Sequence, residues 1–462
     1  MFEQRFYVEG LAHASYLFGA NGEAAVVDPK RDVNDYLAAA NARNLKIVAI
    51  FETHPHADFV SGHLELARRT GAAIYVSHLA PATYERVSVR DGDIVRIGSL
   101  EVMVIETPGH SPDSVTYLVR EGGLAVAVFT GDTLFVGDVG RPDLRDAEAA
   151  PEALAFALYH SLFEKLLKLP DHVRVFPAHG AGSLCGRNIS GAPDSTIGAE
   201  RAGNWALQIA EHEKFVERML GNLPERPPYF AHDVAINLKG APELSTAPVV
   251  IEMTETQLAA HVSAGGYVID TREPALFGAG HVPGSLNIGL DSALFATWVG
   301  FFVPSDRPLA LVVDKVTEVE QARLELARIG YDDIVGYIEG NTLVDLAQTS
   351  QWSVNDLREA MRLGLAPRLL DVRTVSEWDE YHIDGAIHIP LPRLPRRLDR
   401  LPKEEPLAVI CGGGYRSSIA ASLLERNGFR HPQNVMGGIA AYRKTAPREW
   451  SPAELVFIGQ GI

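Results

Sequence analysis

The chain has 462 residues, enough for about three domains of ordinary size. Its 42 basic and 59 acidic residues give a net charge of −17, which argues against nucleic acid or an anionic membrane surface as the main partner. No apolar run is long enough to cross a bilayer, and the first ten residues lack the features of a secretory signal. The two cysteines, Cys185 and Cys411, are too few for a disulfide framework, so we expect a cytoplasmic protein.

The first 240 residues predict a mixed α/β domain. Residues 45–51 (LKIVAIF) are a short, apolar, β-branched run, typical of a parallel strand that is covered on both faces. Other strands are expected in a meander over 5–29 and at 73–77, 94–97, 100–107, 114–119, 124–130 and 173–176. Helices are expected at 33–44, from residue 61 onward, at 152–169 and at about 205–220. Residues 222–228 (NLPERPP) predict a semi-rigid linker, so this domain should end near residue 240.

The rest of the chain contains one sequence pattern twice. Residues 268–272 (VIDTR) reappear as 369–373 (LLDVR), and a His-x-x-Gly pattern follows each copy with the same shift of 101 residues. A period near 100 is too long for a solenoid repeat and fits two copies of one small α/β domain. The domains that we expect are therefore 1–240, 241–345 and 346–462.

Four loops of the first domain carry histidine or aspartate directly after predicted strands. Residues 53–58 (THPHAD) follow the strand at 45–51, and the other three loops carry His110, Asp132 and His179. Because open α/β sheets place their chemistry at the carboxyl ends of strands, we expect these side chains to come together. Imidazole and carboxylate are ligands that first-row transition metals accept. The alternative for each histidine taken singly is a satisfied residue of the core.

The order and spacing of these motifs resemble the metallo-β-lactamase fold, an αββα sandwich, over residues 1 to about 240. Within that superfamily the chain looks most like the persulfide dioxygenases, also called sulfur dioxygenases. Residues 140–143 (GRPD) and 158–165 (LYHSLFEK) add to this likeness.

The resemblance implies one Fe(II) per chain held by His54, His110 and Asp132, with zinc as an adventitious occupant in purified protein. It also implies that O₂ and a low-molecular-weight thiol persulfide, such as glutathione persulfide, are the substrates and that sulfite is a product. The expected outer hydrogen-bond partners, which would orient the ligands and bound water, are His56, Asp58 and His179.

Phe59 is a departure from related hydrolases. Metal-dependent hydrolases of this fold, such as the glyoxalase II thioesterases, carry His-x-His-x-Asp-His, and Phe59 stands at the last position here. Phenylalanine cannot bind a metal, which disfavours a two-zinc hydrolase. The alternative is that Phe59 only fills space while His179 still helps to bind a second ion, so a thioester hydrolase stays the rival function.

Two further features of this domain carry alternatives. Arg141, with Asp143 beside it in sequence, is a candidate for binding the carboxylate of a glutathione-like carrier, because its fork suits planar anions. The alternative is an ion pair between Arg141 and Asp143. Cys185 lies in a loop of small residues after His179, where it either relays sulfur or packs as a small buried residue.

A glycine-rich loop in the last domain predicts a reactive thiol. The apolar strand 407–410 runs into Cys411, three glycines, Tyr415 and Arg416, and a helix is expected over 419–427. The glycines let backbone N–H groups converge as an anion nest at a helix N-terminus, which together with the arginine should lower the thiol pKa. The alternative is an inert buried cysteine. The loop residues expected to bind substrate are Gly412, Gly413, Gly414 and Tyr415.

This loop resembles the active loop of rhodaneses, whose Cys-x₄-Arg spacing is one residue shorter than that of protein phosphatases. The resemblance implies that Cys411 and Arg416 are catalytic and that the domain moves sulfane sulfur. In the earlier copy, Asp314 aligns with the cysteine and Val319 with the arginine, so we expect that copy to be catalytically silent.

The order dioxygenase, silent rhodanese, active rhodanese resembles bacterial fusion enzymes that clear persulfides in sulfide detoxification. It implies α/β architecture throughout, with parallel sheets in both rhodanese-like domains. The expected small-molecule partners are a thiol persulfide, O₂ and thiosulfate or sulfite, with neither nucleic acid nor membrane. The sequence does not name the carrier thiol, and a homo-oligomer is an open expectation because this fold often pairs.

Overall fold

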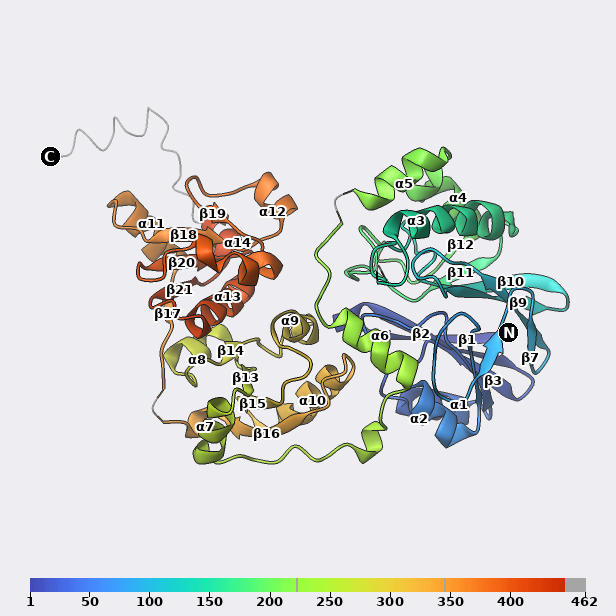
Figure 1. The fold of residues 1–462 in the computed structure, drawn as a ribbon, viewed down its shortest axis with the longest axis horizontal. Helices are drawn as coiled ribbons and strands as arrows, with labels where there is room; N and C mark the ends of the chain where they lie inside the picture. The colour runs from blue at the N-terminus through green and yellow to red at the C-terminus, as the bar shows by residue number, and fades with distance from the viewer. Residues whose placement is uncertain (146, 222, 345, 445–462) are drawn as a thin grey trace. The chain divides into compact units, whose positions relative to one another are not determined.

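A computed structural model describes residues 1–145, 147–221, 223–344 and 346–444. The start of the expected linker at 222, the boundary residue 345 and the end of the third expected domain, 445–462, lie outside them. The chain divides into two compact units (Figure 1). The first comprises Met1–Ile251, Ser292–Pro308 and Val319–Ile334, and the second comprises Glu252–Asp291, Leu309–Glu318 and the chain from Val335 onward. Within the described ranges, no helix combines the length and the apolar character needed to cross a membrane.

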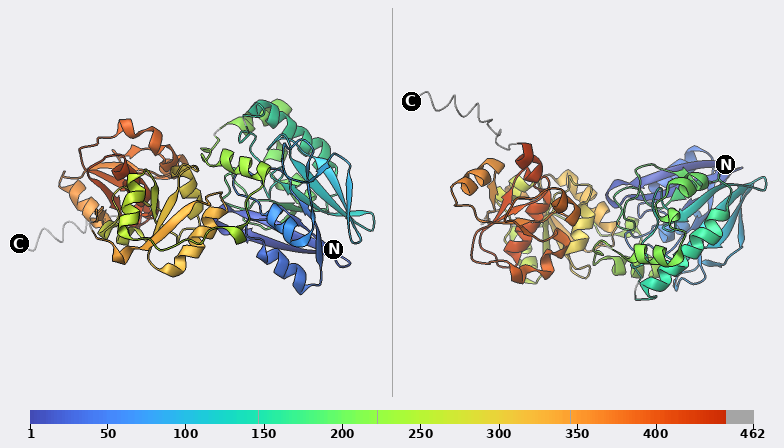
Figure 2. Two further views of the ribbon diagram at one scale, coloured as in Figure 1. Left: turned by 60° about the horizontal axis from the view of Figure 1, so that its bottom comes forward. Right: turned by 90° about the horizontal axis from the view of Figure 1, so that it is seen from above.

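The first unit contains two six-stranded sheets, whose separate layers Figure 2 shows from further directions. The strands of one sheet are, in spatial order, β1 (Phe2–Val8), β2 (His13–Ala20), β3 (Glu23–Val27), β4 (Lys46–Phe51), β5 (Ala73–Ser77) and β6 (Val87–Val89). Those of the other are β12 (Ser195–Thr196), β11 (Arg174–Pro177), β10 (Leu124–Gly131), β9 (Val115–Glu121), β8 (Leu100–Glu106) and β7 (Ile94–Ile97). The sequence does not predict β6 and β12, because strands of two or three residues are too short to show an alternating pattern.

Aromatic and branched side chains between these sheets form the central core. Phe18 and Phe51 from the first sheet pack with Tyr117, Phe129 and Phe176 from the second. The opposite faces of both sheets pack against helices, which completes the expected αββα sandwich. Strand β4 pairs in parallel with both of its neighbours and buries its two faces, as its apolar sequence predicts.

The helices of the first unit differ from the expectation in four places. They are α1 (Asn34–Ala42), α2 (His63–Thr70), α3 (Pro151–His160), α4 (Ile197–Gly203), α5 (His212–Leu220), α6 (Phe230–Lys239), α9 (Phe295–Phe302) and α10 (Val319–Ala327). The helix expected over 152–169 is α3 followed by a π turn and a 3₁₀ turn. The helix expected from 205 begins only at His212, after a separate 3₁₀ turn. The sequence does not predict α4 or α6; in α6 the polar Asp233 and Asn237 lie on the buried face and interrupt the apolar pattern.

Two helices of the expected silent domain, α9 and α10, belong to the first compact unit. The carbonyl oxygen of Arg328, which follows α10, accepts a 2.7 Å hydrogen bond from the N–H of Val60. The Arg328 guanidinium also binds the Asp32 carboxylate through two contacts of 2.9 Å. The metal-loop region is therefore braced by a segment almost 270 residues later in the chain.

The second unit confirms the internal repeat as two parallel sheets. Their strands are β14 (Leu286–Asn287), β13 (Tyr267–Asp270), β15 (Leu309–Val313) and β16 (Ile334–Glu339) in one, and β17 (Ser350–Trp352), β21 (Pro432–Val435), β20 (Leu407–Ile410), β18 (Arg368–Asp371) and β19 (Ile387–His388) in the other. Its helices are α7 (Glu255–Ser263), α8 (Pro274–Ala279), α11 (Val354–Arg362), α12 (Val375–Glu380), α13 (Tyr415–Arg426) and α14 (Gly438–Lys444). The repeated Asp-x-Arg forms the same buried pair in each copy, at 2.6 Å for Asp270–Arg272 and 2.7 Å for Asp371–Arg373.

Candidate functional site

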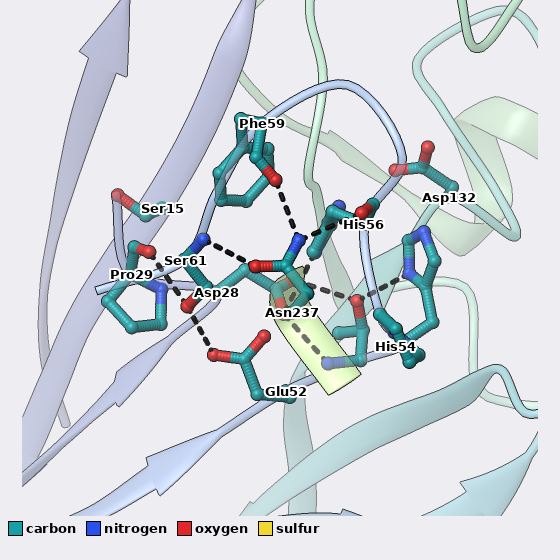
Figure 3. A network of polar contacts seen from close by, with 12 residues as sticks. Ser15, Asp28, Pro29, Glu52, His54, His56, Phe59, Ser61, Asp132 and Asn237 are labelled. Carbon is teal, nitrogen blue, oxygen red and sulfur yellow. Dashed lines mark hydrogen bonds and ion pairs between the residues drawn. The ribbon is translucent and has the colours of Figure 1, made fainter. Parts of the chain in front are cut away.

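The loop after β4 fixes the ring of His54 through a buried carboxylate. Asp28 accepts hydrogen bonds from the Thr53 N–H (2.7 Å) and from the Thr53 hydroxyl (2.8 Å). Because this hydroxyl donates to Asp28, its oxygen accepts from Nδ1 of His54, 3.1 Å away. His54 Nε2 is then the nitrogen that is free to bind a metal (Figure 3).

His110 and Asp132 complete a group of three potential ligands. The Arg141 carbonyl lies 3.0 Å from Nδ1 of His110 and can only accept, so Nδ1 carries the proton and Nε2 carries the lone pair. Asp132 directly follows β10, and its Oδ2 lies 3.4 Å from His110 Nε2. One ligand atom from each of His54, His110 and Asp132 lies within 4.8 Å of the others. The structure therefore brings together the three ligands expected from the sequence.

These side chains suit a cation on their own chemistry. Among the described residues, His54 Nε2 and both carboxylate oxygens of Asp132 are buried without a hydrogen-bond partner. Burying an uncompensated carboxylate costs several kcal/mol, on the order of 3 or more, unless a positive charge accompanies it. Burial lowers the pKa of both His54 and His110, which keeps both imidazoles in the neutral form that binds metals.

A second group shares Asp132. His56, Asp132 and His179 also present ligand atoms within 4.8 Å of one another. Nδ1 of His179 donates to the Ala12 carbonyl (3.2 Å), and Nε2 faces Asp58 at 3.3 Å and Asp132 at 3.5 Å. Burial works to lower the pKa of His179, but these two carboxylates raise it to about 10. The expected outer partners His56, Asp58 and His179 are thus at the site. A metal ion bound by His56, Asp132 and His179 would have to displace the proton that the raised pKa keeps on His179.

Asn237, on α6, is a positioning residue that sequence reasoning misses. Its Nδ2 donates to the carbonyls of His56 (2.8 Å) and Phe59 (2.7 Å), and its Oδ1 accepts from the Ser61 N–H (2.8 Å), as Figure 3 shows. One buried amide thus holds the backbone on both sides of the loop that carries the ligands. No local motif marks it, because its partners lie about 180 residues earlier.

His13 is another residue at the site that the sequence analysis does not single out. Its ring stacks on Phe59 with centroids 3.7 Å apart, and it lies 5.9 Å from the ring of His179. Phe59 is only 1% exposed, so the phenyl ring fills the core beside the metal-loop histidines.

Arg141 forms the ion pair with Asp143 that was one of its two expected roles. The guanidinium makes two contacts with Asp143 (2.7 and 2.6 Å), and it donates to the carbonyls of Leu184 (3.3 Å) and Pro224 (2.8 Å). Arg141 is buried, and its own carbonyl orients His110. It thereby ties together the loops around the metal group, and substrate binding by Arg141 and Asp143 stays a prediction.

The loop after β20 has the expected cradle. Cys411 is 1% exposed, and its Sγ accepts from the Gly414 N–H at 3.1 Å. The Ser417 hydroxyl lies 3.3 Å from the same sulfur. Gly414 has φ +105°, which favours glycine and lets α13 begin at Tyr415, four residues earlier than expected.

Arg416 is held by a carboxylate that sequence reasoning misses. Its two terminal nitrogens contact Glu377 at 2.7 and 2.6 Å. Burial works to raise the pKa of Glu377, but Arg416 and the Thr374 N–H lower it to about 2. Glu377 also completes a capping box with Thr374 at the start of α12, so the Thr-x-x-Glu pattern was its one visible signal.

The corresponding loop of the earlier copy differs as expected. The Glu318 carboxylate accepts from the N–H groups of Asp314 (3.2 Å) and Lys315 (3.4 Å). An internal carboxylate therefore uses donors that could otherwise face an anion, and the cysteine is absent.

The silent copy contacts the helix that carries the active loop. The Tyr415 hydroxyl donates to the Gly289 carbonyl at 3.1 Å. The Ser418 hydroxyl donates to Asn287 Oδ1 at 2.5 Å, and the Asn287 N–H donates to the Ser422 hydroxyl at 3.0 Å. These contacts fix the first two turns of α13 from outside its own domain.

Comparison with known proteins agrees with this architecture. Residues 8–179 match the metallo-beta-lactamase superfamily, and residues 254–342 and 353–445 match the rhodanese-like domain. The mouse protein "Persulfide dioxygenase ETHE1, mitochondrial" is 30% identical over 46% of this chain and 78% of its own length. The chain belongs to the metallo-beta-lactamase superfamily. More fully, it is a fusion of a persulfide dioxygenase-like metallo-beta-lactamase domain with two rhodanese-like domains.

Two further relatives of this chain are a metallo-beta-lactamase and a hydrolase. A crystal structure of a metallo-beta-lactamase from Staphylococcus aureus aligns with a TM-score of 0.67 and 32% identity, covering 73% of this chain and 99% of that one. A hydroxyacylglutathione hydrolase from Rhodopseudomonas palustris is 29% identical over 48% of this chain and 86% of its own length. The metallo-beta-lactamase domain thus has relatives whose names denote an oxygenase and a hydrolase.

Proposed function

We propose that the protein oxidises a low-molecular-weight thiol persulfide with O₂ and that its last domain transfers sulfane sulfur. The first reaction is RSSH + O₂ + H₂O → RSH + SO₃²⁻ + 2H⁺. The likeness to persulfide dioxygenases and the paired rhodanese-like domains support this combination.

The observation that carries the proposal is the buried set of His54, His110 and Asp132. Two neutral imidazoles and one carboxylate are the donor set of non-haem Fe(II) oxygenases, which leaves positions for substrate and O₂. When bound, Fe(II) supplies the redox chemistry with O₂ that amino-acid side chains lack.

The surrounding residues keep these donors in the ligating form. Thr53 and the Arg141 carbonyl hold the protons of His54 and His110 on Nδ1, and Asn237 holds the loop backbone. Burial excludes water from the donor atoms and so strengthens their attraction for a cation. His56, Asp58 and His179 would hold protons and hydrogen bonds around the substrate sulfur.

In the last domain, Cys411 would act as the sulfur acceptor. Its thiolate attacks the outer sulfur of thiosulfate, the S–S bond breaks, and sulfite leaves: Cys411–S⁻ + S₂O₃²⁻ → Cys411–S–S⁻ + SO₃²⁻. The Gly414 N–H points at the reacting sulfur, and Arg416 beside it supplies positive charge for the anion. The reverse reaction would form thiosulfate from sulfite and a persulfide.

A thioester hydrolase of the glyoxalase II class is the second candidate. The group of His56, Asp132 and His179 favours it, because a second ion there would build a two-metal site. The hydroxyacylglutathione hydrolase relatives point the same way. Phe59, in place of the further histidine of such enzymes, disfavours it.

Metal analysis and an oxygen electrode distinguish the two functions. The full chain, reconstituted anaerobically with Fe(II), should consume O₂ with glutathione persulfide and release sulfite. His54→Ala should abolish O₂ uptake and leave thiosulfate:cyanide sulfurtransfer intact, and Cys411→Ser should do the reverse. Turnover of S-lactoylglutathione by the zinc-loaded protein, without O₂ uptake by the iron-loaded protein, would establish the hydrolase instead.

A further inference from the structure

A line of three polar side chains leads from strand β17 to the sulfur of Cys411. Gln351 lies in the middle of β17, Asn434 lies in β21, and Ser417 lies in the first turn of α13. The side chains of Asn434 and Ser417 are fully buried, and Cys411 is 1% exposed. The sulfur transfer at Cys411 has so far given these three side chains no role.

The hydrogen bonds along this line run in one direction. The Thr349 carbonyl can only accept, so it receives a proton of the Gln351 amide nitrogen at 3.3 Å. Gln351 Oε1 therefore faces Asn434, whose Nδ2 donates to it at 2.8 Å. This orientation turns Asn434 Oδ1 toward the Ser417 hydroxyl, and the two oxygens are 2.6 Å apart. Because an amide oxygen has no proton, the Ser417 hydroxyl is the donor.

The proton of Ser417 is consequently turned away from the sulfur. A hydroxyl carries one proton, and two other acceptors compete for it, the Gly414 carbonyl at 3.1 Å and Cys411 Sγ at 3.3 Å. Asn434 Oδ1 makes the shortest of the three contacts. With its proton on that side, the Ser417 oxygen presents a lone pair to Cys411. A lone pair there stabilises a thiol, whose S–H can donate to it, and opposes a thiolate.

Other groups around the sulfur act in the opposite sense. The Gly414 N–H donates to Sγ at 3.1 Å, and Arg416 lies within electrostatic reach of the same sulfur. Two carboxylates lie near Arg416: Glu377 pairs with it directly, and Asp371 belongs to the buried Asp-x-Arg pair. The cradle thus combines donors that stabilise a thiolate with one line of hydrogen bonds that stabilises the thiol.

We propose that Asn434 is a positioning residue that keeps the resting Cys411 as a thiol. This role rests on the sulfur transfer proposed for Cys411. A resting thiol resists oxidation better than a thiolate does. Once the thiol proton leaves, the Ser417 hydroxyl turns from Asn434 to the sulfur, because a charged acceptor binds it more strongly than an amide oxygen does.

One turnover with thiosulfate then releases one proton to solvent: Cys411–SH + S₂O₃²⁻ → Cys411–S–S⁻ + SO₃²⁻ + H⁺. The S–H bond of the cysteine and the S–S bond of thiosulfate break, and a new S–S bond forms on Cys411. Sulfite leaves with the electron pair of the broken S–S bond.

The test measures alkylation of Cys411 by iodoacetamide in the full chain as a function of pH, with peptide mass spectrometry to follow this cysteine alone. Asn434→Leu removes the competing acceptor, so the Ser417 hydroxyl can donate to the thiolate, and the pH profile should shift to lower pH. Below the midpoint the rate should rise about threefold, because the gain in thiolate is partly offset by its lower reactivity. Gln348→Leu is the matched control, since this exposed amide donates to the Ala279 carbonyl instead, and it should leave the profile unchanged.

A double substitution separates this role from a general structural one. In a Ser417→Ala background, Asn434→Leu should no longer shift the profile, because the hydroxyl through which Asn434 acts is gone. Gln351→Leu releases the Asn434 amide from its anchor, should shift the profile in the same direction, and provides the measurement should Asn434→Leu not fold. An unshifted profile, a shift to higher pH, or a shift that persists without the Ser417 hydroxyl would overturn the role of Asn434.

Thiosulfate:cyanide sulfurtransfer at limiting thiosulfate distinguishes this role from the reaction on which it rests. In Asn434→Leu its pH profile should shift together with the alkylation profile. A shifted alkylation profile in a protein that transfers no sulfur would refute the proposed sulfur transfer and leave the hold of Asn434 on the thiol standing. Normal sulfurtransfer with unshifted alkylation would refute the role of Asn434 alone.

Discussion

Asn237→Ala tests whether a distant amide holds the metal loop. The substitution removes the partner of two buried carbonyls, His56 and Phe59, and of the buried Ser61 N–H. At about 1 kcal/mol of net stabilisation for each hydrogen bond, the free energy of unfolding should fall by about 3 kcal/mol. This is a large part of the 5–15 kcal/mol (roughly) that stabilises an ordinary domain. The backbone that carries His54 and His56 should also loosen, so Fe(II) affinity should fall by about 10- to 100-fold.

Urea unfolding followed by circular dichroism measures the stability, and competition with a chelator measures the iron affinity. Lys239→Ala is the matched control, because Lys239 is an exposed residue on the same helix. It should change the unfolding free energy by less than about 0.5 kcal/mol. If Asn237→Ala changes the unfolding free energy and the iron affinity no more than Lys239→Ala does, the Asn237 amide has no positioning role. The metal loop is then held by strand β4 and by the contacts of Asp28.

Four other predictions concern the contacts around the two sites. Glu377→Gln should lower thiosulfate:cyanide sulfurtransfer without changing O₂ uptake, because it releases Arg416 from its two-point contact. The pKa of Glu377 is lowered to about 2, so the ion pair between Glu377 and Arg416 should be fully formed above about pH 4.5. Its contribution to stability should be lost only as the pH falls toward 2. Acid unfolding of the wild type and of Glu377→Gln, compared side by side, measures this contribution. Asn287→Ala should lower sulfurtransfer through the loss of its contact with Ser418, again with O₂ uptake unchanged, and equal rates would show that the silent copy does not position the loop. Arg141→Lys should lower the unfolding free energy by about 2 kcal/mol through loss of its two-point pairing; a raised KM for glutathione persulfide at unchanged stability would instead support substrate binding.

The sequence predicts what depends on local pattern. The strand at β4 and the repeated Asp-x-Arg follow from apolar periodicity and short motifs, and the resemblance to the metallo-β-lactamase fold implied the αββα order. Because strand ends meet at one edge, the sequence predicted that the four loops with histidine or aspartate come together, and the resemblance to persulfide dioxygenases implied His54, His110 and Asp132 as the ligand set. The sequence did not predict where α5 begins, because a 3₁₀ turn precedes this helix. It did not predict α6 at all, because polar residues occupy the buried face of that helix.

The residues that the sequence does not reveal share one physical property: each acts on a partner that is distant along the chain. Asn237 reaches the metal loop, and Glu377 reaches Arg416. Their local sequence carries no periodic signal for the role, because a single side-chain contact constrains neither neighbouring residues nor helix and strand spacing.

Contacts from distant parts of the chain also explain why the functional loops of this protein are well ordered. A loop pays conformational entropy for order and has no ladder of backbone hydrogen bonds to offset it. Here each functional loop is instead fixed by a polar side chain from another element. The buried Asn237 of α6 holds the metal loop, and the half-buried Glu377 of α12 holds Arg416 at the start of α13. Since an unpaired buried polar group is costly, these contacts favour one loop conformation over its alternatives. The ligand and nucleophile positions therefore depend on side chains that need not touch substrate, and substitutions at those side chains should impair the two activities separately.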